Sequence, residues 1–594
     1  MPPFTKVLVA NRGEIAVRIF RTLRELGIGT VAVYSEPDRD ALHVAAADDA
    51  YLVGAGPAAE SYLRGDRIIE AGLRAGAEAI HPGYGFLAEN ADFARAVEVA
   101  GLVWIGPPPA AIAAMGSKIE ARERMRSAGV PIVPGTTEVA ASAAAALAAA
   151  AEIGFPVAIK ASAGGGGKGL KVARSPDEVE RAFEAAGREG EAYFADASVY
   201  VERYLEDPRH VEVQILADEH GNVVHLGERD CTIQRRHQKL VEETPSPAVN
   251  AELRERIGRI AVQAAAAAGY RSAGTVEGLL ATDGAYYFLE MNTRVQVEHT
   301  VTEAVTGIDI VREQVLIAAG EPLSMAQDDV RLRGHAIECR INAEDAGNGF
   351  LPSPGVITAY REPGGIGVRV DSGLRAGDMI SDLYDPLVAK LVVHDVDRER
   401  ARLRMLRALE EFVIEGPATL IGFHRALLES PCFVEGGTCR GVVESPELAQ
   451  RAHELEQQLS HWKTTIAAQS DGSLGTNVRT LSIELDGRRH EVRLNSPVPP
   501  WAELARRHRE RRKGLSGAAT DAVVSPMQGT VLEVEVGEGD VIDAGRVICV
   551  VEAMKMENEI AAHRSGVVSE LAVVAGQQVG HGQLICVIRE EQDA

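Results

Sequence analysis

The chain has 594 residues, which corresponds to about four domains at about 150 residues each. Hydrophobic residues make up 46% and charged residues 25%, as in folded globular proteins and unlike disordered ones. Acidic residues number 86 and basic residues 62, and the formal net charge of −24 argues against nucleic acid or an anionic membrane as the main partner. No apolar run approaches the ~18 residues that a membrane span needs, and the N-terminus has no signal-peptide pattern.

The cysteines have neither the spacing of a metal site nor that of a disulfide framework. They are Cys231, Cys339, Cys432, Cys439, Cys549 and Cys586, and no two of them form a Cys-x-x-Cys pair. This spacing predicts no zinc site and a reducing compartment. Together with the charge, it predicts a large, acidic, cytoplasmic, multidomain protein.

The first 110 residues alternate short apolar runs with helical patterns. Residues 6–10 and 30–34 are typical of buried strands, and the stretch 13–26 between them has apolar side chains at helical spacing. A third strand is expected to end in the glycine loop 79–85. This alternation predicts a parallel α/β sheet, with a domain boundary near Pro107–Pro109.

The alanine-rich stretch 139–151 predicts a helix, because alanine has the highest helix propensity. The α/β pattern continues to about residue 445, after which a pair of short strands is expected at 480–485 and 489–494. The six basic residues between Arg506 and Lys513 lack interleaved glycine and aromatic residues. They favour a solvated linker or a partner-docking face over a nucleic-acid-binding arm.

Residues 521–590 contain an internal repeat with an offset of 37. The matching pairs are Gly529/Gly566, Val531/Val568, Gly539/Gly576, Gly545/Gly582, Ile548/Ile585, Cys549/Cys586 and Val550/Val587. This repeat predicts a quasi-twofold pair of small β-sheets. The segment 552–559 joins the two halves, and we expect it to form a hairpin that projects Lys555.

A glycine-rich loop at 163–169 follows the strand-like segment 156–160. Consecutive glycines allow backbone N–H groups to surround phosphate oxygens, while nearby lysines neutralise their charge. The loop lacks the spacing of a Walker A sequence. Taken alone, it is also compatible with a mobile surface turn.

Oxygen ligands are expected near the ends of two further strands, at Glu277 and at 288–292. Glu290 and Asn292 lie two residues apart and therefore share one face of a strand. Together with Glu277 they predict a site of hard oxygen ligands, suited to Mg²⁺ that bridges nucleotide phosphates. Each of these residues alone would more often be simply solvated.

The next residues combine a cation, an amide and a carboxylate. We expect Arg294, Gln296 and Glu298 to share one strand face, where they could hold a small planar oxyanion and remove its proton. The run 228–239 adds Gln234, His237 and Lys239 as candidate anion contacts, although a solvated basic strand explains that run equally well.

Together these motifs resemble biotin carboxylase, an ATP-grasp enzyme. The motifs are the stretches 11–18, 81–90, 163–169, 229–239, 290–299 and 338–344, and the resemblance covers roughly residues 4–446. Residues 521–590, with Ala553-Met-Lys-Met556, resemble the biotin carboxyl carrier domain. The whole chain resembles the α subunits of bacterial acyl-CoA carboxylases of the acetyl-/propionyl-CoA type.

The resemblance implies an α/β fold in five parts. These are a Rossmann-like N-terminal domain (1–112), an ATP-grasp domain (113–330), an α+β C-terminal domain (331–446), a small β-rich linker or shortened docking domain (447–520), and an all-β, lipoyl-like biotinyl sandwich (521–590).

The resemblance also implies roles for individual residues. Expected to contact ATP are Lys118, Lys160, Gly166, Gly167, Glu202, Arg203, Tyr204, Leu205, His210, Gln234, His237, Glu277 and Glu290. Glu277, Glu290 and Asn292 would hold two Mg²⁺ or Mn²⁺ ions. Lys239, Arg294, Gln296 and the Val297 backbone would bind bicarbonate, with Glu298 as its base. Arg340 would stabilise the biotin enolate, Tyr84 would lie near the biotin ring, and Lys555 would carry biotin covalently.

The implied reaction is ATP-dependent carboxylation of carrier-bound biotin by bicarbonate through carboxyphosphate. The segment 447–520 is too short for a carboxyltransferase domain, so a separate β subunit is expected, and a single-chain pyruvate carboxylase is disfavoured. Biotin protein ligase is the expected transient partner, and a biotin carboxylase dimer the expected assembly. The alternating strand at 481–485, together with Trp462 and Trp501, predicts that the segment 447–520 docks the β subunit.

Two other functional classes remain as alternatives. One is a different ATP-grasp ligase that joins a carboxylate to an amine, and the carrier lysine argues against it. The other is a non-enzymatic carrier with a decayed ATP site, which the intact reacting groups argue against. Three positions depart from the family pattern, namely Gly278, Thr300 and Leu383.

Overall fold

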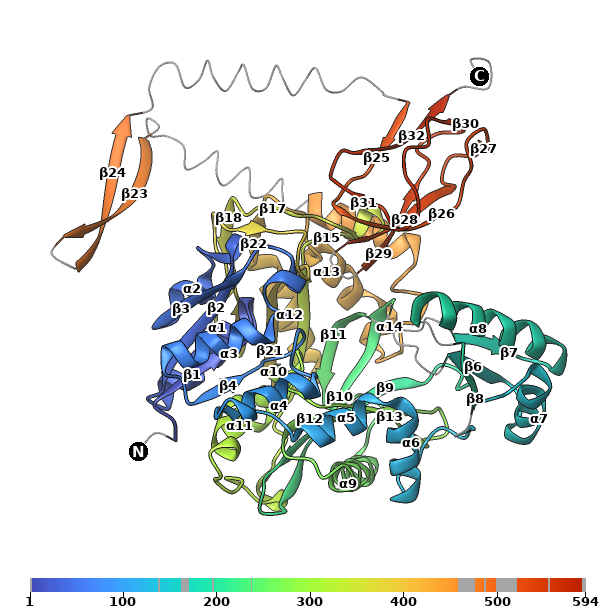
Figure 1. The fold of residues 1–594 in the computed structure, drawn as a ribbon, viewed down its shortest axis with the longest axis horizontal. Helices are drawn as coiled ribbons and strands as arrows, with labels where there is room; N and C mark the ends of the chain where they lie inside the picture. Colours follow the sequence, from blue (N-terminus) through green and yellow to red (C-terminus); the bar gives the residue numbers. More distant parts are fainter. Residues whose placement is uncertain are drawn as a thin grey trace. The chain divides into compact units, whose positions relative to one another are not determined.

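The computed structural model describes residues 3–136, 139–161, 170–194, 197–236, 238–457, 476–485, 488–497, 521–553 and 556–589. The chain divides into two compact units, residues 1–453 and residues 454–594 (Figure 1). Each unit has its own sheets and its own hydrophobic core.

The first unit begins with a parallel sheet, as the sequence predicts. Its strands run in the order β3-β2-β1-β4-β5, and every neighbouring pair is parallel. The strands are β1 (Lys6–Val9), β2 (Gly29–Ser35), β3 (Asp49–Gly54), β4 (Ala79–His81) and β5 (Val103–Trp104), and the helices between them are α1 (Gly13–Glu25), α2 (Leu42–Ala46), α3 (Gly65–Ala75) and α4 (Ala91–Val99). Leu8, Val31 and Ile80 lie in the core beneath these helices.

A small layered subdomain, called the lid below, follows α5 (Pro109–Gly116) and α6 (Lys118–Ser127). It consists of α7 (Ala143–Ile153), β6 (Val157–Ala161), β7 (Leu170–Ala173), α8 (Val179–Phe194) and β8 (Val199–Arg203). The strands form a sheet in the order β7-β6-β8 (teal in Figure 1). The predicted alanine-rich helix is α7, and its residues Ala146 and Ala150 are fully buried in the lid's core.

An antiparallel sheet of eight strands, in the order β13-β12-β9-β10-β11-β14-β21-β19, forms the centre of the first unit. Its members are β9 (Arg209–Ala217), β10 (Val223–Arg235), β11 (Gln238–Thr244), β12 (Ser272–Leu280), β13 (Tyr286–Asn292), β14 (His335–Asn342), β19 (Val368–Ser372) and β21 (Leu387–Asp395). The helices α9 (Ala251–Ala267), α10 (His299–Thr306) and α11 (Ile310–Ala318) also belong to this part. Because β11 pairs with β14, the sheet runs across the predicted boundary at residue 330 without interruption.

The C-terminal part of the first unit mixes short strand pairs with helices. The pairs are β15 (Glu344–Asp345) with β16 (Leu351–Pro352), β17 (Gly355–Val356) with β20 (Met379–Ile380), and β18 (Ala359–Arg361) with β22 (Val413–Glu415). The helices are α12 (Arg398–Glu411), α13 (Ile421–Glu429) and α14 (Pro431–Val434), and a helix over residues 446–457 runs across the division between the two units. This arrangement is the α+β character that the resemblance implied.

The second unit contains a strand pair and a two-sheet sandwich. The predicted pair forms as β23 (Thr476–Leu485) and β24 (Arg488–Pro497), which are antiparallel. The sandwich strands are β25 (Ala522–Val524), β26 (Gly529–Val534), β27 (Val541–Ile542), β28 (Val547–Ala553), β29 (Met556–Ala561), β30 (Gly566–Ser569), β31 (Gln578–Val579) and β32 (Leu584–Arg589). Its sheets have the orders β25-β32-β30-β27 and β29-β28-β26-β31.

The sandwich follows the sequence repeat strand by strand. A shift of 37 residues carries β26 onto β30, β27 onto β31 and β28 onto β32. The repeated residues Ile548, Cys549, Ile585 and Cys586 are all fully buried between the sheets. The repeat therefore encodes a single core that both halves share.

Two cysteines are bonded although their spacing does not indicate it. The structure pairs Cys432 with Cys439, seven residues apart, in a disulfide. The other four cysteines are free and buried. A separation of seven carries no signal by itself, because only the turn after α14 brings the two Cα atoms to 5.6 Å.

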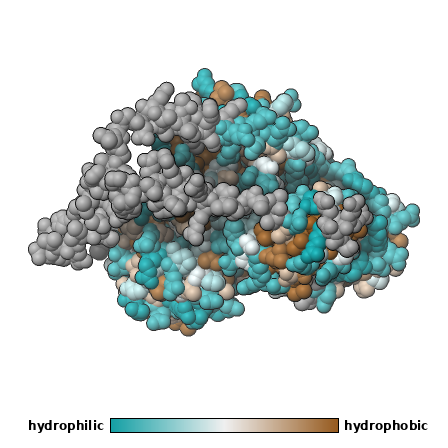
Figure 2. Space-filling model, turned by 90° about the horizontal axis from the view of Figure 1, so that it is seen from above, coloured by the Kyte–Doolittle hydropathy of each residue, from teal (hydrophilic) through white to brown (hydrophobic). Residues whose placement is uncertain are grey.

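The surface drawn in Figure 2 is mainly hydrophilic, with apolar side chains gathered in limited areas. Exposed large apolar residues include Ile366, Met379, Val396 and Leu403. Among the described residues, no helix combines the length and the apolar character needed to cross a membrane.

Candidate active site

A row of glutamates crosses three neighbouring strands of the eight-stranded sheet. In the antiparallel register, Glu277 of β12 lies between Glu212 of β9 and Glu290 of β13. Residues that are directly paired in a sheet point to the same face, so these side chains share one surface. The predicted ligands Glu277 and Glu290 are therefore neighbours, and Glu212 is a third member that the sequence reasoning missed.

The ammonium group of Lys239 lies at the centre of this surface. Its Nζ contacts Glu212 Oε2 at 2.5 Å and Glu298 Oε1 at 2.6 Å, and it lies 3.1 Å from Glu277 Oε1. All three carboxylates are buried. Burial lowers the pKa of Lys239, but the three carboxylates raise it well above its ordinary value, so the amine is charged.

Glu298 lies between two cations. Its Oε1 accepts from Lys239, and its Oε2 pairs with Arg340 Nη2 at 2.9 Å. Burial alone would raise the pKa of Glu298, but Lys239 and Arg340 lower it well below its ordinary value. Glu298 is therefore an ionised carboxylate in a dry environment, which is the state that a proton acceptor requires.

Arg340 is held by a second buried carboxylate. It projects from β14, and its Nε donates to Glu242 Oε1 at 2.7 Å. Burial raises the pKa of Glu242, and Glu338 and Glu298 raise it further against the opposing effect of Arg340. Glu242 thus fixes the guanidinium group of Arg340 beside Glu298.

The segment with Arg294, Gln296 and Glu298 is not a strand, so the expectation of a shared strand face was wrong. Strand β13 ends at Asn292, and Glu298 directly precedes helix α10. Two contacts hold this segment: Lys390 of β21 donates to the Val297 carbonyl at 3.0 Å, and Arg229 donates to Gln296 Oε1 at 2.7 Å. The three side chains still lie near one another, but a loop rather than the alternation of a strand positions them.

Arg229 organises this loop and was not assigned a role from the sequence. Its side chain is fully buried, and all five of its N–H donors have acceptors. The acceptors are Glu212, Gln214, Thr302, Thr275 and Gln296. Because arginine can only donate, Gln296 must turn its oxygen to Arg229 and its amide nitrogen to Glu277 Oε1, at 2.6 Å.

Arg294 and Asn292 lie at the edge of this cluster. Arg294 Nε donates to Glu89 at 3.0 Å, and its Nη2 donates to Asn292 Oδ1 at 3.1 Å. Asn292 in turn donates from Nδ2 to Glu277 Oε1 at 2.6 Å. Glu89, from the loop before α4, is a further residue that the sequence reasoning left without a role.

The predicted ATP contacts fall on both sides of the lid's connection to the sheet. Lys160 of β6 donates to Glu202 of β8 at 2.5 Å, and Arg122 binds the other oxygen of Glu202. Beyond β8, His210 Nε2 lies 2.8 Å from Glu277 Oε2. Burial lowers the pKa of His210, but Glu277 raises it above its ordinary value.

The remaining predicted ATP contacts occupy three kinds of position. Arg203 ends β8, where its N–H bonds to Pro134 O at 2.8 Å, and Tyr204 and Leu205 follow it. Gln234 lies near the end of β10 and donates to Cys231 O at 2.7 Å. Gly166, Gly167, His237 and the biotin-attachment candidate Lys555 lie outside the described residues, as does the side chain of Lys118.

Tyr84 belongs to a separate buried cluster. Its hydroxyl donates to Glu14 of α1, and Glu14 Oε2 lies 3.2 Å from Lys390 Nζ. Lys390 is completely buried, and it also binds the Val297 carbonyl. Burial raises the pKa of Glu14 to about 7. This cluster joins Tyr84, in the loop after β4, to the loop that carries Gln296 and Glu298.

The donor set suits divalent cations that bind phosphate oxygens. Oxygen atoms of Glu212 and Glu277 and a nitrogen of His210 all lie within 4.8 Å of one another. Carboxylate oxygens such as those of Glu212, Glu277 and Glu290 are the hard ligands that Mg²⁺ prefers, and the strand register places these three residues side by side. Glu277 and Glu290 fit as ligands directly, whereas Asn292 would have to turn Oδ1 away from Arg294.

The three departures from the family pattern each have a structural partner. A Cβ added at Gly278 would approach Tyr286 Cζ to 2.3 Å, so the ring of Tyr286 occupies the space of a larger side chain. Thr300 donates its hydroxyl to Glu338. Leu383 lies against Gly56, and a Cβ added at Gly56 would lie 2.7 Å from Leu383 Cδ1.

Four family models match the chain in consecutive segments. The biotin carboxylase N-terminal domain matches residues 3–112, the carbamoyl-phosphate synthase L chain ATP-binding domain matches 117–326, and the biotin carboxylase C-terminal domain matches 338–445. The model of biotin-requiring enzymes matches residues 521–588.

Known proteins extend this similarity. The chain is 47% identical over 578 residues to the biotin-dependent acyl-coenzyme A carboxylase alpha3 subunit of Mycobacterium leprae, which covers 95% of each chain. It is 54% identical to a pyruvate carboxylase subunit of Methanothermobacter thermautotrophicus, over 73% of this chain and 88% of that one. A crystal structure of the biotin carboxylase domain of Hydrogenobacter thermophilus 2-oxoglutarate carboxylase, with MgADP, ADP and bicarbonate, matches with a TM-score of 0.71 and 49% identity, covering 75% of this chain and 98% of that one.

The buried ion pair of Lys390 and Glu14 leads to a prediction about the free energy of unfolding. Lys390→Met should lower the free energy of unfolding by about 3–5 kcal/mol, because it leaves a buried carboxylate without its cation. Adding Glu14→Gln should restore part of this loss, since the carboxylate is then removed as well. Urea unfolding of the full chain measures both changes.

The matched control is Lys6→Met, which breaks a partly exposed pair with Asp49. It should cost less than about 1 kcal/mol. An equal loss of stability in the Lys6 and Lys390 variants would contradict the structural importance of the Lys390 pair.

Proposed function

Because this chain belongs to the biotin-dependent carboxylases and combines an ATP-dependent biotin carboxylase with a biotinyl carrier domain, we propose that it is the α subunit of an acyl-CoA carboxylase. In this proposal it carboxylates biotin on its own carrier domain, and a separate carboxyltransferase β subunit transfers the carboxyl group to an acyl-CoA. The observation that carries the catalytic part is the ionised Glu298 held between Lys239 and Arg340.

Bicarbonate binding is assigned to the surface around Lys239. The ammonium group of Lys239, the guanidinium group of Arg294, the amide of Gln296 and the backbone of Val297 would hold the anion. The bond from Arg229 supports this role of Gln296, because it leaves the amide nitrogen facing the cluster. Glu298 would accept the bicarbonate proton on a carboxylate oxygen while bicarbonate attacks the γ-phosphate of ATP.

Nucleotide binding is assigned to both sides of the lid. The glycines Gly166 and Gly167, together with Lys118, Lys160 and His237, would bind phosphates, and the stretch 202–205 with His210 and Gln234 would hold the rest of ATP. Two Mg²⁺ or Mn²⁺ ions held by Glu277, Glu290 and Asn292 would neutralise charge on the phosphate oxygens. The carboxylate row across β9, β12 and β13 supports this assignment.

Biotin would enter between Tyr84 and Arg340. Arg340 carries a charge opposite to that of a biotin enolate, and its bond to Glu242 holds it in place. Lys555 would carry the biotin, attached by biotin protein ligase. Strands β28 and β29 pair as far as Ala553 and Met556, and the segment that joins them in the sequence is the proposed attachment site.

The carboxyl group could be transferred to an acyl-CoA or to pyruvate, and these two proposals differ only in that acceptor. The pyruvate carboxylase subunit is 54% identical over 433 residues, whereas the acyl-CoA carboxylase subunit is 47% identical over 578 residues, a span that extends through the carrier domain. We therefore favour an acyl-CoA. The test is reconstitution with the co-purifying carboxyltransferase β subunit, followed by comparison of acetyl-CoA, propionyl-CoA and pyruvate as acceptors. Turnover of pyruvate alone would refute the acyl-CoA assignment.

The proposal also includes the organisation of the protein in the cell. We infer a cytoplasmic α/β complex with paired biotin carboxylase domains. The five-part division at 112, 330, 446 and 520 is retained, although the ATP-grasp and C-terminal domains share one sheet and should unfold together.

Replacing the proposed base makes the first functional prediction. Glu298→Gln should lower the bicarbonate-dependent ATPase rate by about 10²–10⁴, because the amide cannot accept the proton. The dissociation constant of ATP should change little, as Glu298 is assigned to bicarbonate. Glu415→Gln, an exposed carboxylate in β22, is the control and should retain the wild-type rate. A Glu298→Gln enzyme with normal turnover would refute the assignment.

Lys555→Arg tests biotin attachment. The substitution keeps the charge but removes the primary amine, so streptavidin should no longer detect the chain, while carboxylation of free biotin should persist. Lys6→Arg serves as the control and should remain labelled. Streptavidin binding that survives in Lys555→Arg would identify another attachment site.

The β23–β24 hairpin is proposed as part of the docking region for the β subunit. Two isolated strands are marginal by themselves, so a partner surface would complete them. Replacing residues 470–500 with a Gly/Ser linker of equal length should abolish pull-down of the β subunit but preserve carboxylation of free biotin. Undiminished pull-down would assign docking to another surface.

A further inference from the structure

The disulfide between Cys432 and Cys439 closes a short surface loop. Cys432 lies in α14 and is partly exposed, whereas Cys439 is buried. Cys439 has a φ of +51°, which is uncommon for a residue other than glycine. The cross-link therefore contributes to holding Cys439 in a conformation that a free chain would seldom adopt.

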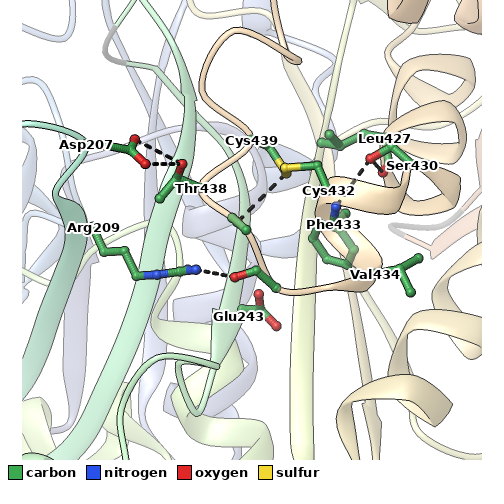
Figure 3. Close-up of a disulfide and its surroundings, with 12 residues drawn as sticks. Asp207, Arg209, Glu243, Leu427, Ser430, Cys432, Phe433, Val434, Thr438 and Cys439 are labelled. Carbon is green, nitrogen blue, oxygen red and sulfur yellow. Dashed lines mark hydrogen bonds between the residues drawn. A yellow bond between two sulfur atoms is a disulfide. The ribbon is translucent and has the colours of Figure 1, made fainter. Parts of the chain in front are cut away.

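This loop holds the segment 207–209 (Figure 3). Arg209 donates from Nη2 to the Gly436 carbonyl, and Thr438 donates its hydroxyl to the carboxylate of Asp207 at 3.0 Å. Arg440, directly after the second cysteine, donates to Pro208 O at 3.3 Å. The loop closed by the disulfide and the residue directly after it thus contact three consecutive residues.

The segment 207–209 is the connection between the lid and the eight-stranded sheet. It follows β8, the last strand of the lid, and Arg209 is the first residue of β9. Leu205 lies just before it and His210 just after it. Asp207 has a φ of +45°, so this connection also has a constrained backbone.

We propose that Cys432 and Cys439 form a thiol–disulfide exchange site that sets the affinity for ATP, and that its reductant is a dithiol of the small redox-protein class. The inference rests on the proposed assignment of Leu205 and His210 to ATP. Disulfides in a reducing compartment are usually transient and redox-sensing, and the proposed cytoplasmic location places this disulfide there.

The exchange is balanced by the dithiol. One thiolate of the reductant attacks the Sγ of Cys432, the more exposed of the two residues, and the S–S bond breaks to release Cys439 as a thiolate that takes up a proton. The second thiolate of the reductant then attacks the reductant sulfur that is bonded to Cys432. Cys432 leaves as a thiolate, which also takes up a proton. Two electrons and two protons pass to the protein, and the reductant becomes a disulfide.

Reduction would act on the lid connection and leave the reacting groups in place. Without the cross-link, Cys439 can leave its left-handed conformation, and the loop that carries Gly436 and Thr438 loses its fixed position. Asp207 and Arg209 then lose hydrogen-bond partners, and the segment 207–209 becomes less ordered. ATP binding has to order this segment again, and the entropy cost weakens the affinity for ATP. Glu298 is held by Lys239 and Arg340, which lie on β11 and β14, so the catalytic step is unaffected.

The experiment compares the air-oxidised full chain with the same protein after dithiothreitol treatment. Maleimide labelling under denaturing conditions should count four thiols before reduction and six afterwards. Reduction should raise the KM for ATP about 5-fold or more, with kcat for free-biotin carboxylation unchanged. Hydrogen exchange of residues 204–210 should become faster on reduction.

Two variants separate the redox effect from a general effect of the reductant. Cys432→Ser should show the high ATP KM of the reduced protein with or without dithiothreitol. Thr438→Val keeps the disulfide but loses the bond to Asp207, so it should raise the ATP KM while four thiols are still counted.

Six labelled thiols in the oxidised protein, or the same ATP KM in both redox forms, would overturn the exchange site. The wild-type comparison decides this even if a variant fails to fold. ATP-dependent activity that is absent in both redox forms would instead contradict the function proposed above, so the two failures are distinguishable.

Discussion

The contact of one lysine with three buried carboxylates is the interaction on which the rest of the site depends. Lys239 pairs with Glu212, Glu277 and Glu298, which come from two strands and a loop far apart in the sequence. Removing charges from water is costly, and such a cluster persists only when each group has partners. Each carboxylate here has one, because Arg229 and His210 bind the outer oxygens of Glu212 and Glu277, and Arg340 binds that of Glu298. The cluster is therefore a network in which buried carboxylates and cations alternate.

The continuous sheet explains why groups from different domains meet with such short contacts. Lys239 lies on β11 and Arg340 on β14, and the two strands are hydrogen-bonded neighbours although the predicted domain boundary falls between them. A rigid sheet under both residues keeps Glu298 between its two cations. The lid, in contrast, leads into the sheet through residues 204–208, and the loop closed by Cys432 and Cys439 contacts this connection. The proposed base and the connection to the lid are therefore held by different parts of the fold.

The carrier sandwich shows how a repeat specifies structure. Residues that recur at an offset of 37 are the ones that must fill a shared core, such as Ile548 with Ile585 and Cys549 with Cys586. Glycines recur at the same offset, and Gly539 and Gly576 both have positive φ values that other residues rarely adopt. The sequence of one half therefore predicts the fold of the other.

The sequence by itself determined the parallel N-terminal sheet, the β23–β24 pair and the twofold sandwich, because local periodicity and repetition report which side of a strand or helix is buried. It also determined which reacting residue types are present, through short motifs such as 290–299. Only the tertiary structure decided that 293–298 is a loop, that Arg229 orients Gln296, that Lys390 joins Glu14 to Val297, and that Cys432 pairs with Cys439. These facts depend on contacts between segments separated by up to several hundred residues, or on a turn that no spacing rule specifies. Periodicity describes which face a residue occupies, whereas only packing decides which partner lies opposite it.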